Sequence, residues 1–280
     1  MTPVVALSIA GSDSGAGAGV QADLKTFAAH GVYGTCAVTA VTAQNTLGVS
    51  DVVAIGAPFV TAQVLAVVTD FPVRAVKTGM LCGPDIVRAV AELAADGRLP
   101  NLVVDPVLVS SSGHPLLAEG GLDAYSALLP HAVVATPNLE EAAALTGRPL
   151  SDLRSVDGMA RAAAELRAAG PAVVVVTGGH LPGAGGHPPP GTTPGAPDVV
   201  AGPDGTVVLD GPRIVTRNDH GTGCTFSAAI AAHLALGHPA LEAVRRGHDY
   251  VRRALAASAG WRLGAGRGPL DHVAGSGLPS

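Results

Sequence analysis

The chain has 280 residues and a formal net charge of −5, and 48% of its residues are hydrophobic although only 3% are aromatic. This length fits one large α/β domain or two small ones, with a core built mainly from Ala, Val and Leu side chains. The acidic balance, without any basic block, argues against nucleic-acid binding. Three widely spaced cysteines, Cys36, Cys82 and Cys224, indicate neither a disulfide framework nor a zinc site.

The N-terminal segment and the hydropathy pattern predict a cytoplasmic protein. The chain enters an apolar run at residues 4–10 with no basic segment before it, which is typical of a first strand rather than a signal peptide. No apolar stretch approaches the ~18 residues that a membrane-spanning helix requires. We therefore expect neither secretion nor insertion into a membrane.

Short β-branched runs alternate with Ala- and Leu-rich amphipathic segments along most of the chain. We expect strands at residues 4–10, 35–41, 75–78, 102–105, 133–136 and 173–177. We expect helices at residues 20–30, 58–70, 85–96, 120–129, 139–145, 157–169, 225–236 and 241–259. Strands with a helix between them form βαβ units, so the sequence predicts a mostly parallel sheet that is covered by helices on both faces.

One segment interrupts this alternation. Residues 182–197 are rich in Gly and Pro and cannot form a helix or a central strand. Two short β-like runs follow, at 198–201 and 205–209, and they predict an antiparallel hairpin after a flexible loop. The loop and hairpin form either a surface insert or a flap over the active site. Residues 1–262 are predicted to form one domain, and residues 263–280 a loosely held C-terminal extension.

The most informative motif is a glycine turn that leads directly into a predicted helix, and it comprises His220, Gly221, Thr222, Gly223 and Cys224. A helix N-terminus offers free backbone N–H groups and a positive dipole end to an anion, and glycines allow close approach. The alternative is an ordinary glycine-rich helix start. A thiol at this position is predicted to have a lowered pKa, which would let Cys224 accept a proton from a substrate hydroxyl. The alternative for Cys224 is a buried structural cysteine.

Two other phosphate-binding patterns fit poorly. The chain contains no Gly-Lys-Ser or Gly-Lys-Thr, so it has no Walker loop. Gly17, Gly19 and Ala22 match G-x-G-x-x-A, but residues 37–45 include no acidic side chain that could bind a ribose. A dinucleotide-dependent oxidoreductase is therefore disfavoured.

An ordered set of motifs resembles one enzyme family. With the glycine turn, the set comprises GSDSGAGAGVQAD at 11–23, TAQNT at 42–46, KTGML at 77–81, DPV at 105–107, TPNLEE at 136–141 and GGH at 178–180. Together these motifs resemble the hydroxymethylpyrimidine/phosphomethylpyrimidine kinases of thiamine biosynthesis, within the ribokinase-like superfamily. The resemblance implies a three-layer α/β fold, with a mostly parallel central sheet flanked by helices and a small antiparallel hairpin or flap, and it makes residues 1–262 the kinase domain.

The resemblance also implies an activity and a set of site residues. The activity is ATP- and Mg²⁺-dependent phosphorylation of 4-amino-5-hydroxymethyl-2-methylpyrimidine and then of its monophosphate, by a homodimer. The implied catalytic residues are Cys224, Gly221, Thr222 and Gly223. The implied pyrimidine contacts are Gly11, Asp23, Gln44, Met80 and Val107. The implied nucleotide and phosphate contacts are Asn138, Thr177 and His220, and the implied Mg²⁺ ligands are Asp105 and Glu141.

Several of these residues have a plainer interpretation when the resemblance is set aside. Asp23 is then a charge in the first turn of a helix, Gln44 a loop residue and Met80 a core residue. Asp105 and Glu141 are then helix caps or surface charges.

One position departs from the family pattern. The family commonly has a lysine before Gly178, where an ammonium group can reach nucleotide phosphates, whereas this chain has Thr177. A hydroxyl cannot replace that charge. Either an arginine such as Arg217 compensates, or Mg²⁺ suffices, or turnover is slower. Two alternative functions stay open: a pyridoxal/pyridoxine kinase of the same superfamily, and a non-catalytic pyrimidine-binding protein.

Overall fold

A computed structural model describes residues 2–109, 113, 116–179 and 195–274 of the chain. Its strands form one nine-stranded sheet with the order β3-β2-β1-β4-β5-β6-β7-β8-β9. The strands are β1 (Val5–Asp13), β2 (Tyr33–Asn45), β3 (Gly48–Ala54), β4 (Val73–Thr78), β5 (Leu102–Val104), β6 (Val134–Ala135), β7 (Val173–Val176), β8 (Asp198–Gly202) and β9 (Gly205–Leu209). The α-helices are α1 (Gly19–Ala29), α2 (Ala57–Asp70), α3 (Pro84–Ala95), α4 (Gly121–Leu128), α5 (Leu139–Thr146), α6 (Val156–Ala168), α7 (Thr222–Ala235) and α8 (Ala240–Ser258).

The middle of the sheet is parallel and both edges are antiparallel. β1 pairs in parallel with β2 and β4, and β4, β5, β6 and β7 continue in parallel. β3 pairs antiparallel with β2 at one edge, and β8 and β9 pair antiparallel at the other. All four residues of β7 are buried, as expected of a strand that is covered on both faces. The predicted fold class is therefore confirmed.

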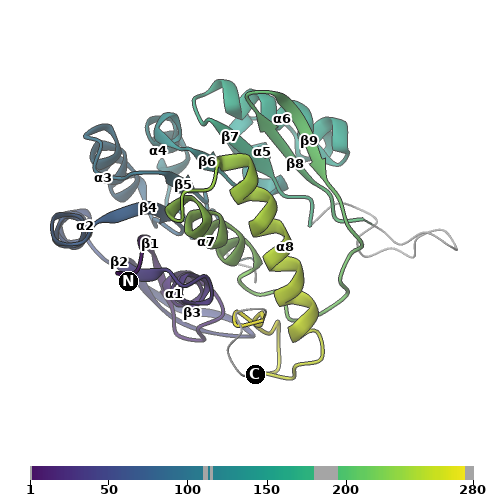
Figure 1. Ribbon diagram of the computed structural model, residues 1–280, viewed down its shortest axis with the longest axis horizontal. Helices are drawn as coiled ribbons and strands as arrows, with labels where there is room; N and C mark the ends of the chain where they lie inside the picture. Colours follow the sequence, from purple (N-terminus) through teal and green to yellow (C-terminus); the bar gives the residue numbers. More distant parts are fainter. Residues whose placement is uncertain (1, 110–112, 114–115, 180–194, 275–280) are drawn as a thin grey trace, which may run out of the picture.

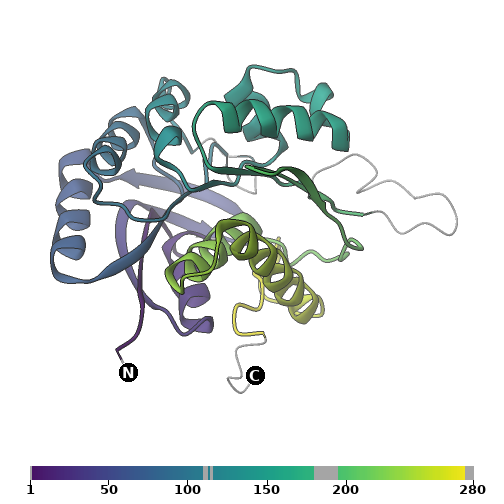
Figure 2. The same cartoon turned by 45° about the horizontal axis from the view of Figure 1, so that its top comes forward.

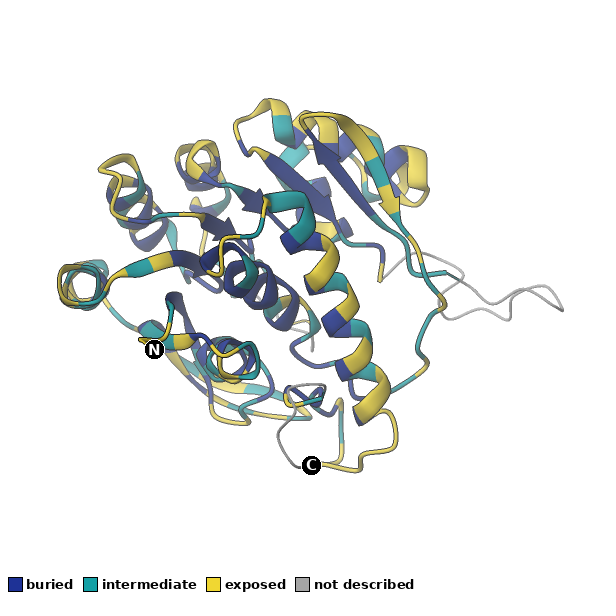
Figure 3. Cartoon of the chain, in the orientation of Figure 1, coloured by how far each residue is buried: buried dark blue, intermediate teal, exposed yellow. Residues whose placement is uncertain are grey.

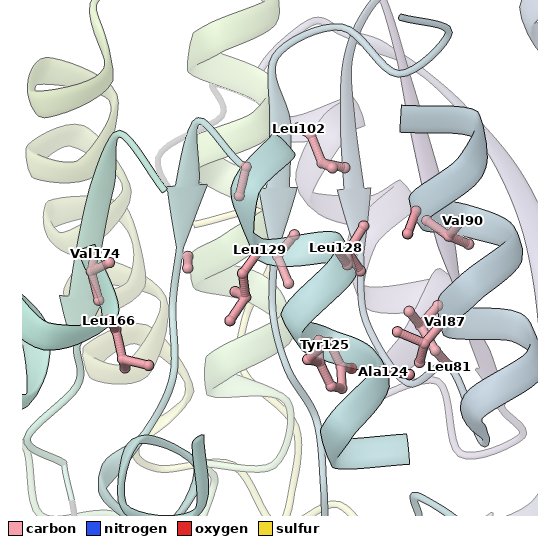
Figure 4. Close-up of a cluster of buried hydrophobic side chains, with 14 of the residues drawn as sticks. Leu81, Val87, Val90, Leu102, Ala124, Tyr125, Leu128, Leu129, Leu166 and Val174 are labelled. Carbon is pink, nitrogen blue, oxygen red and sulfur yellow. The ribbon is translucent and has the colours of Figure 1, made fainter. Parts of the chain in front are cut away.

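Helices cover the sheet in two layers. α1, α7 and α8 lie on one face, and α2, α3, α4, α5 and α6 lie on the other (Figures 1 and 2). Each face has its own apolar cluster: Leu7 and Val76 belong to one, Phe27 and Ile230 to the other. Figure 4 shows side chains of α3 and α4 directed at one another over the sheet, and Figure 3 shows that α7 is buried along most of its length. Among the described residues, no helix is both long and apolar enough to cross a bilayer.

The predicted elements omit β3, and the reason lies in its exposure. No residue of this strand is fully buried, and Ser50, Asp51, Val53 and Ala54 are exposed. A strand that buries neither face need not alternate apolar and polar residues, so the period-2 pattern that identifies a strand is absent. β2 also extends four residues beyond its predicted end, through a polar segment.

The hairpin and the C-terminal segment differ from expectation in their placement. β8 and β9 are the predicted antiparallel pair, but they extend the sheet at its edge beside β7. Residues 182–194 of the predicted loop lie outside the described residues. The prediction of a loosely held tail is wrong for residues 263–274. The Arg267 N–H donates to the Thr46 carbonyl oxygen at 2.9 Å, Leu270 is buried, and the Tyr250 hydroxyl donates to the His272 carbonyl oxygen at 2.5 Å.

We expect Gly158→Ala to destabilise the protein, because α6 begins in close contact with the loop before it. A Cβ atom at Gly158 would overlap the Asp152 carbonyl oxygen, which is backbone and cannot turn aside. Overpacking of this kind costs about 1–3 kcal/mol of unfolding free energy. Gly260→Ala is the matched control, since a Cβ there meets nothing within 4 Å. Urea unfolding of both variants measures the difference, and equal losses would contradict the expectation.

Candidate active site

The predicted site residues gather at the edge of the sheet where the parallel strands end. β1 ends at Asp13, Asp105 follows β5, and Thr177 follows β7. The N-terminal part of α7 reaches the same edge, because the hydroxyl of Ser227, in the second turn of this helix, donates to Oδ2 of Asp105 at 2.9 Å. Ligands of open α/β sheets bind at this edge. The structure therefore brings the glycine turn next to the acidic residue that was predicted to work with it.

Asp13 connects the N-terminal glycine loop to the glycine turn. Its Oδ1 accepts the Gly15 N–H at 2.8 Å, and its Oδ2 accepts the N–H groups of Gly17 and Ala18 at 3.1 and 2.9 Å. Nε2 of His220 lies 2.9 Å from the same Oδ2. Burial alone would raise the pKa of Asp13, but the hydrogen bonds from His220, Ala18 and Gly15 outweigh it and lower the pKa. No role was predicted for Asp13 from the sequence, although this residue lies within the N-terminal motif at residues 11–23.

The glycine turn requires a glycine at position 221. Gly221 has φ +86°, a left-handed conformation, and a Cβ there would overlap the Gly17 carbonyl oxygen. The helix begins at Thr222, whose hydroxyl donates to the Asp219 carbonyl oxygen at 2.7 Å. Gly223 is exposed, so its N-terminal position on α7 is open to a ligand. The turn has the geometry that anion binding at a helix N-terminus needs.

The predicted pyrimidine contacts lie on the β1 and β2 side of this edge. Gly11 lies against Met80, since a Cβ at Gly11 would overlap the Met80 side chain. Gln44 is half-buried, and its Oε1 accepts the Thr42 hydroxyl at 3.1 Å. Nε2 of Gln44 lies 3.3 Å from Nε2 of His220. His220 therefore lies beside a predicted pyrimidine contact, and its contact with the nucleotide stays a prediction. Val107, two residues after the edge acid, is half-buried.

Asp23 occupies a different place from the one predicted. It is fully buried, Nζ of Lys77 lies 2.9 Å from both of its carboxylate oxygens, and the Ser8 hydroxyl donates to Oδ2 at 2.5 Å. Although burial lowers the pKa of Lys77, the Asp23 carboxylate raises it above its usual range, so the ammonium stays charged. A direct hydrogen bond from Asp23 to a pyrimidine ring does not fit this arrangement, because the carboxylate exposes no surface to a ligand.

Lys77 belongs to the KTGML motif, but no role was predicted for it from the sequence. It lies in β4 and is fully buried, yet its charge acts on both Cys224 and Asp105. A lysine inside a strand that is buried on both faces is rare unless it is paired. The sequence contains only two lysines, and this one stands in an apolar run, which was the available signal.

The thiol of Cys224 is not activated in the way the sequence predicted. Burial raises the pKa of Cys224 to about 12, and although Lys77 lowers it, Asp105 and Asp23 raise it further. The pKa is therefore raised, opposite to the direction expected of a thiol at a helix N-terminus, and the prediction of a lowered pKa is wrong for the free protein. The predicted position is observed, since Cys224 lies in the first turn of α7 and is only partly exposed.

Asp105, directly after β5, and Glu141, in the first turn of α5, are two buried carboxylates at this edge. Burial raises the pKa of both, and for Glu141 the neighbouring Asp105 charge raises it further. Glu141 also forms a capping box with Asn138: Oε2 of Glu141 accepts the Asn138 N–H at 2.8 Å, and Oδ1 of Asn138 accepts the Glu141 N–H at 2.9 Å. The capping role that the sequence left open for Glu141 is therefore present, alongside a position at the candidate site.

These residues fit a magnesium ion. Buried like charges favour a cation between them, and Mg²⁺ binds one or two carboxylates while keeping several waters. The hydroxyl oxygens of Thr78 and Thr136, at the ends of β4 and β6, are buried and have no hydrogen-bond partner among the residues that the structure describes, so polar groups at this edge remain to be satisfied. No group of three or more His, Cys, Asp or Glu that could hold a metal occurs among the described residues.

The turn after β7 contains Thr177, a predicted nucleotide contact. The Thr177 N–H donates to the Pro137 carbonyl oxygen at 3.0 Å, which holds the ends of β6 and β7 together. Oδ1 of Asp198 accepts the Gly178 N–H at 3.0 Å. Burial raises the pKa of Asp198 to about 7, although the Gly178 hydrogen bond and the charge of Arg252 lower it.

The sheet topology, the anion-binding turn and the paired carboxylates are those of an α/β kinase that transfers phosphoryl groups. The family model described as phosphomethylpyrimidine kinase matches residues 13–271, and the chain belongs to this family. A hydroxymethylpyrimidine/phosphomethylpyrimidine kinase of Rhizobium meliloti is 48% identical over 270 residues, which cover 96% of each chain.

Solved structures agree with this assignment. A Bacillus subtilis pyridoxal kinase in an ADP complex has a TM-score of 0.85 at 36% identity, covering 98% of each chain. A phosphomethylpyrimidine kinase of Clostridium difficile has a TM-score of 0.75 at 38% identity, covering 90% of this chain and 99% of the other. At these identities, the likeness extends beyond the fold alone.

Lys77→Met should be strongly destabilising, because it leaves the Asp23 carboxylate buried without its partner. Breaking a buried ion pair in this way costs about 3–5 kcal/mol of unfolding free energy. The double variant Lys77→Met/Asp23→Asn removes both charges and should be more stable than Lys77→Met alone. Arg88→Met is the control, since the Arg88–Asp85 pair at 3.3 Å is exposed and should change stability by less than about 1 kcal/mol. A double variant no more stable than the single one would contradict the expectation.

The Asp198 carboxyl should make the protein less stable as pH rises. Its folded pKa of about 7 lies above the unfolded value of about 4, so the folded state holds a proton that the unfolded state releases. The stability that this proton contributes is present below pH 4 and is lost as pH rises to 7. Asp198→Asn keeps an acceptor for Gly178 and removes the titration. Unfolding free energies at pH 5 and pH 8 should therefore favour the variant more at pH 8, and a gain that is equal at both would rule this out.

Proposed function

We propose that this chain transfers the γ-phosphoryl group of ATP to hydroxymethylpyrimidine and then to the resulting monophosphate. Family membership over residues 13–271 supports the reaction class. The observation that carries the proposal is the meeting of three parts at one sheet edge: the Gly221 turn, the Asp105 carboxylate and the wall that includes Met80. A phosphoryl donor and an acceptor hydroxyl that bind at this edge can be aligned by groups that are already in place.

The pyrimidine is proposed to bind between Met80 and Val107, with Gln44 at its edge. Gly11 leaves room beside Met80 because it has no side chain. Gln44 offers a carbonyl oxygen and an amide N–H₂ group, which match an exocyclic amine beside a ring nitrogen. The Thr42 hydroxyl donates to the Gln44 amide oxygen and holds the amide in place, with the His220 ring beside it. This arrangement fixes the ring so that its hydroxymethyl group points to the N-terminus of α7.

Phosphoryl transfer forms a bond between the hydroxymethyl oxygen and the γ-phosphorus and breaks the bond from that phosphorus to the bridging oxygen of ADP. The backbone N–H groups of Gly221 and Gly223 are proposed to bind the γ-phosphoryl oxygens as charge develops on them. The N–H of Thr222, between them, donates to the Asp219 carbonyl oxygen at 3.3 Å and holds the turn in shape. Asp105 and Glu141 would hold Mg²⁺, and a bound Mg²⁺ offsets the negative charge of the nucleotide phosphates. Lys77 contributes a fixed positive charge beneath the same edge.

The hydroxyl proton is proposed to pass to the sulfur of Cys224. Because burial raises the pKa of Cys224 to about 12 in the free protein, the bound substrates must favour its thiolate for this step to occur. Lys77 already acts in that direction. In the second phosphorylation the attacking oxygen belongs to a phosphate and carries no proton that must be removed, so the thiol matters less.

A pyridoxal kinase activity is the second candidate, and one comparison favours it. The pyridoxal kinase structure superimposes over 98% of this chain, against 90% for the phosphomethylpyrimidine kinase structure. Incubation with ATP, Mg²⁺ and either hydroxymethylpyrimidine or pyridoxal, followed by mass spectrometry, separates the two. We expect the pyrimidine monophosphate and then the diphosphate. Phosphorylation of pyridoxal alone would overturn the proposal, and pyrimidine binding without any product would indicate a non-catalytic binding protein.

The family resemblance also supports two proposals about the working state of the protein. We propose a homodimer that acts in the cytoplasm. Light scattering at micromolar concentration tests the homodimer, for which we expect a mass of twice 27.6 kDa.

Cys224→Ala should reduce activity unequally with the two acceptors. Loss of a general base lowers the rate by about 10²- to 10⁴-fold, so kcat/KM with the alcohol should fall by that amount. With the monophosphate the fall should be much smaller. Cys36→Ala, at a cysteine of β2 that has no proposed catalytic role, is the control and should keep both activities. Equal losses with the two acceptors would count against Cys224 as the base.

A further inference from the structure

The turn after β7 is in contact with an arginine that comes from a distant part of the chain. Arg213 follows β9, and its Nη2 donates to the Gly179 carbonyl oxygen at 2.7 Å. On the same turn, the Gly178 N–H donates to Asp198 at 3.0 Å. A backbone donor and a backbone acceptor of the turn are therefore each held by a charged side chain. The guanidinium group of Arg213 thus lies at Gly179, which is two residues after Thr177 in the chain and at the same end of the sheet.

The charge of Arg213 has no carboxylate partner among the described residues. Nε of Arg213 is buried and finds no hydrogen-bond partner in the part of the chain that the structure describes, and burial lowers the pKa of its guanidinium. Other arginines differ: Nε of Arg267 lies 2.8 Å from Asp219, and Nε of Arg246 lies 2.7 Å from Glu242. Guanidinium groups are enriched where phosphates are bound, because their N–H donors match phosphate oxygens in pairs. A partly buried guanidinium with a free donor is therefore suited to an anion.

The position of the Arg213 charge along the sheet indicates which anion this residue would bind. The pyrimidine contacts lie near β1 and β2, and the reacting end lies at Cys224 and Asp105, beside β4 and β5. A phosphate chain that leaves the reacting end on the side away from the pyrimidine passes β6 and then β7. On that path it meets the carboxylate of Glu141 and the uncharged side chain of Thr177. A protein cation at β7 would complement the phosphates there.

We infer that Arg213 binds the nucleotide phosphates at the turn after β7 and supplies there the positive charge that Thr177 does not. This inference rests on the proposed function, in which ATP lies over the ends of β5, β6 and β7. Arg217, which the sequence suggested for this task, is placed elsewhere: it is exposed, and its Nη2 donates to the Gly264 carbonyl oxygen of the C-terminal segment at 3.3 Å. The two arginines make the same kind of bond to a backbone carbonyl but at different places, so they form a matched pair.

The test compares Arg213→Gln, Arg213→Lys and Arg217→Gln. Glutamine keeps an N–H donor for the Gly179 carbonyl oxygen and loses the charge, whereas lysine keeps the charge. Isothermal titration calorimetry of the full chain with ADP and with ATP, in the presence of Mg²⁺, gives the dissociation constants. Thermal unfolding checks that each variant is folded, and the KM for hydroxymethylpyrimidine at saturating ATP reports on the rest of the site.

We expect Arg213→Gln to weaken ADP and ATP binding by about 10- to 100-fold, the usual effect of losing one charge-assisted hydrogen bond. Arg213→Lys should retain most of the affinity, and Arg217→Gln all of it. The KM for the pyrimidine should stay unchanged in all three variants. A purely structural role predicts instead that Arg213→Gln behaves as the wild type, or that the pyrimidine KM rises together with the nucleotide constants.

Either of those results would overturn the assignment of Arg213, as would a loss confined to Arg217→Gln. If Arg213→Gln does not fold, Arg213→Lys decides: a large loss of nucleotide affinity with lysine would contradict a role that depends on charge. Failure of the wild-type chain to bind ADP or ATP at all would instead refute the proposed function itself. Failure of the Arg213 assignment and failure of the proposed function therefore give different results.

Discussion

The buried ion pair between Asp23 and Lys77 is the interaction on which the site depends. It joins α1 to β4 across β1, and the Ser8 hydroxyl completes it. Its cost is desolvation of two charges, which the interior repays only through good geometry and additional hydrogen bonds. What the protein gains is a fixed positive charge immediately beneath Cys224 and Asp105. Because Asp23 fixes the Lys77 ammonium, this group need not move when negative charge develops on the transferring phosphoryl group.

The second constraint is that the site is assembled from both ends of the sequence. Asp13 holds the N-terminal glycine loop and contacts His220, next to the turn that begins α7, and the Arg267–Asp219 ion pair ties the C-terminal segment to the same turn. Side chains on such loops can be placed accurately only if the loops are fixed to one another. This explains why the segment after α8 packs against the domain although its composition resembles that of a free tail.

The sequence predicts the features that depend on local pattern, and it fails where a property depends on three-dimensional surroundings. Buried runs such as β7 and capped helices such as α5 follow from their own residues, whereas β3 buries no face and leaves no pattern. The N-terminal position of Cys224 on α7 was visible, but the burial that raises its pKa to about 12 was not. The contact of His220 with Asp13 spans 207 positions, and no local rule predicts it.

Charge along the sheet edge gives these observations a common physical basis. Lys77 lies in β4, Asp105 follows β5, Glu141 lies in the first turn of α5, and the Arg213 guanidinium lies at the turn after β7. Two cationic positions therefore flank an acidic one. Carboxylates alone would repel nucleotide phosphates, and cations alone would bind them without selecting for a metal complex. An alternating arrangement favours a phosphate chain that carries a divalent cation at its centre, because each charge of the complex then faces its opposite on the protein.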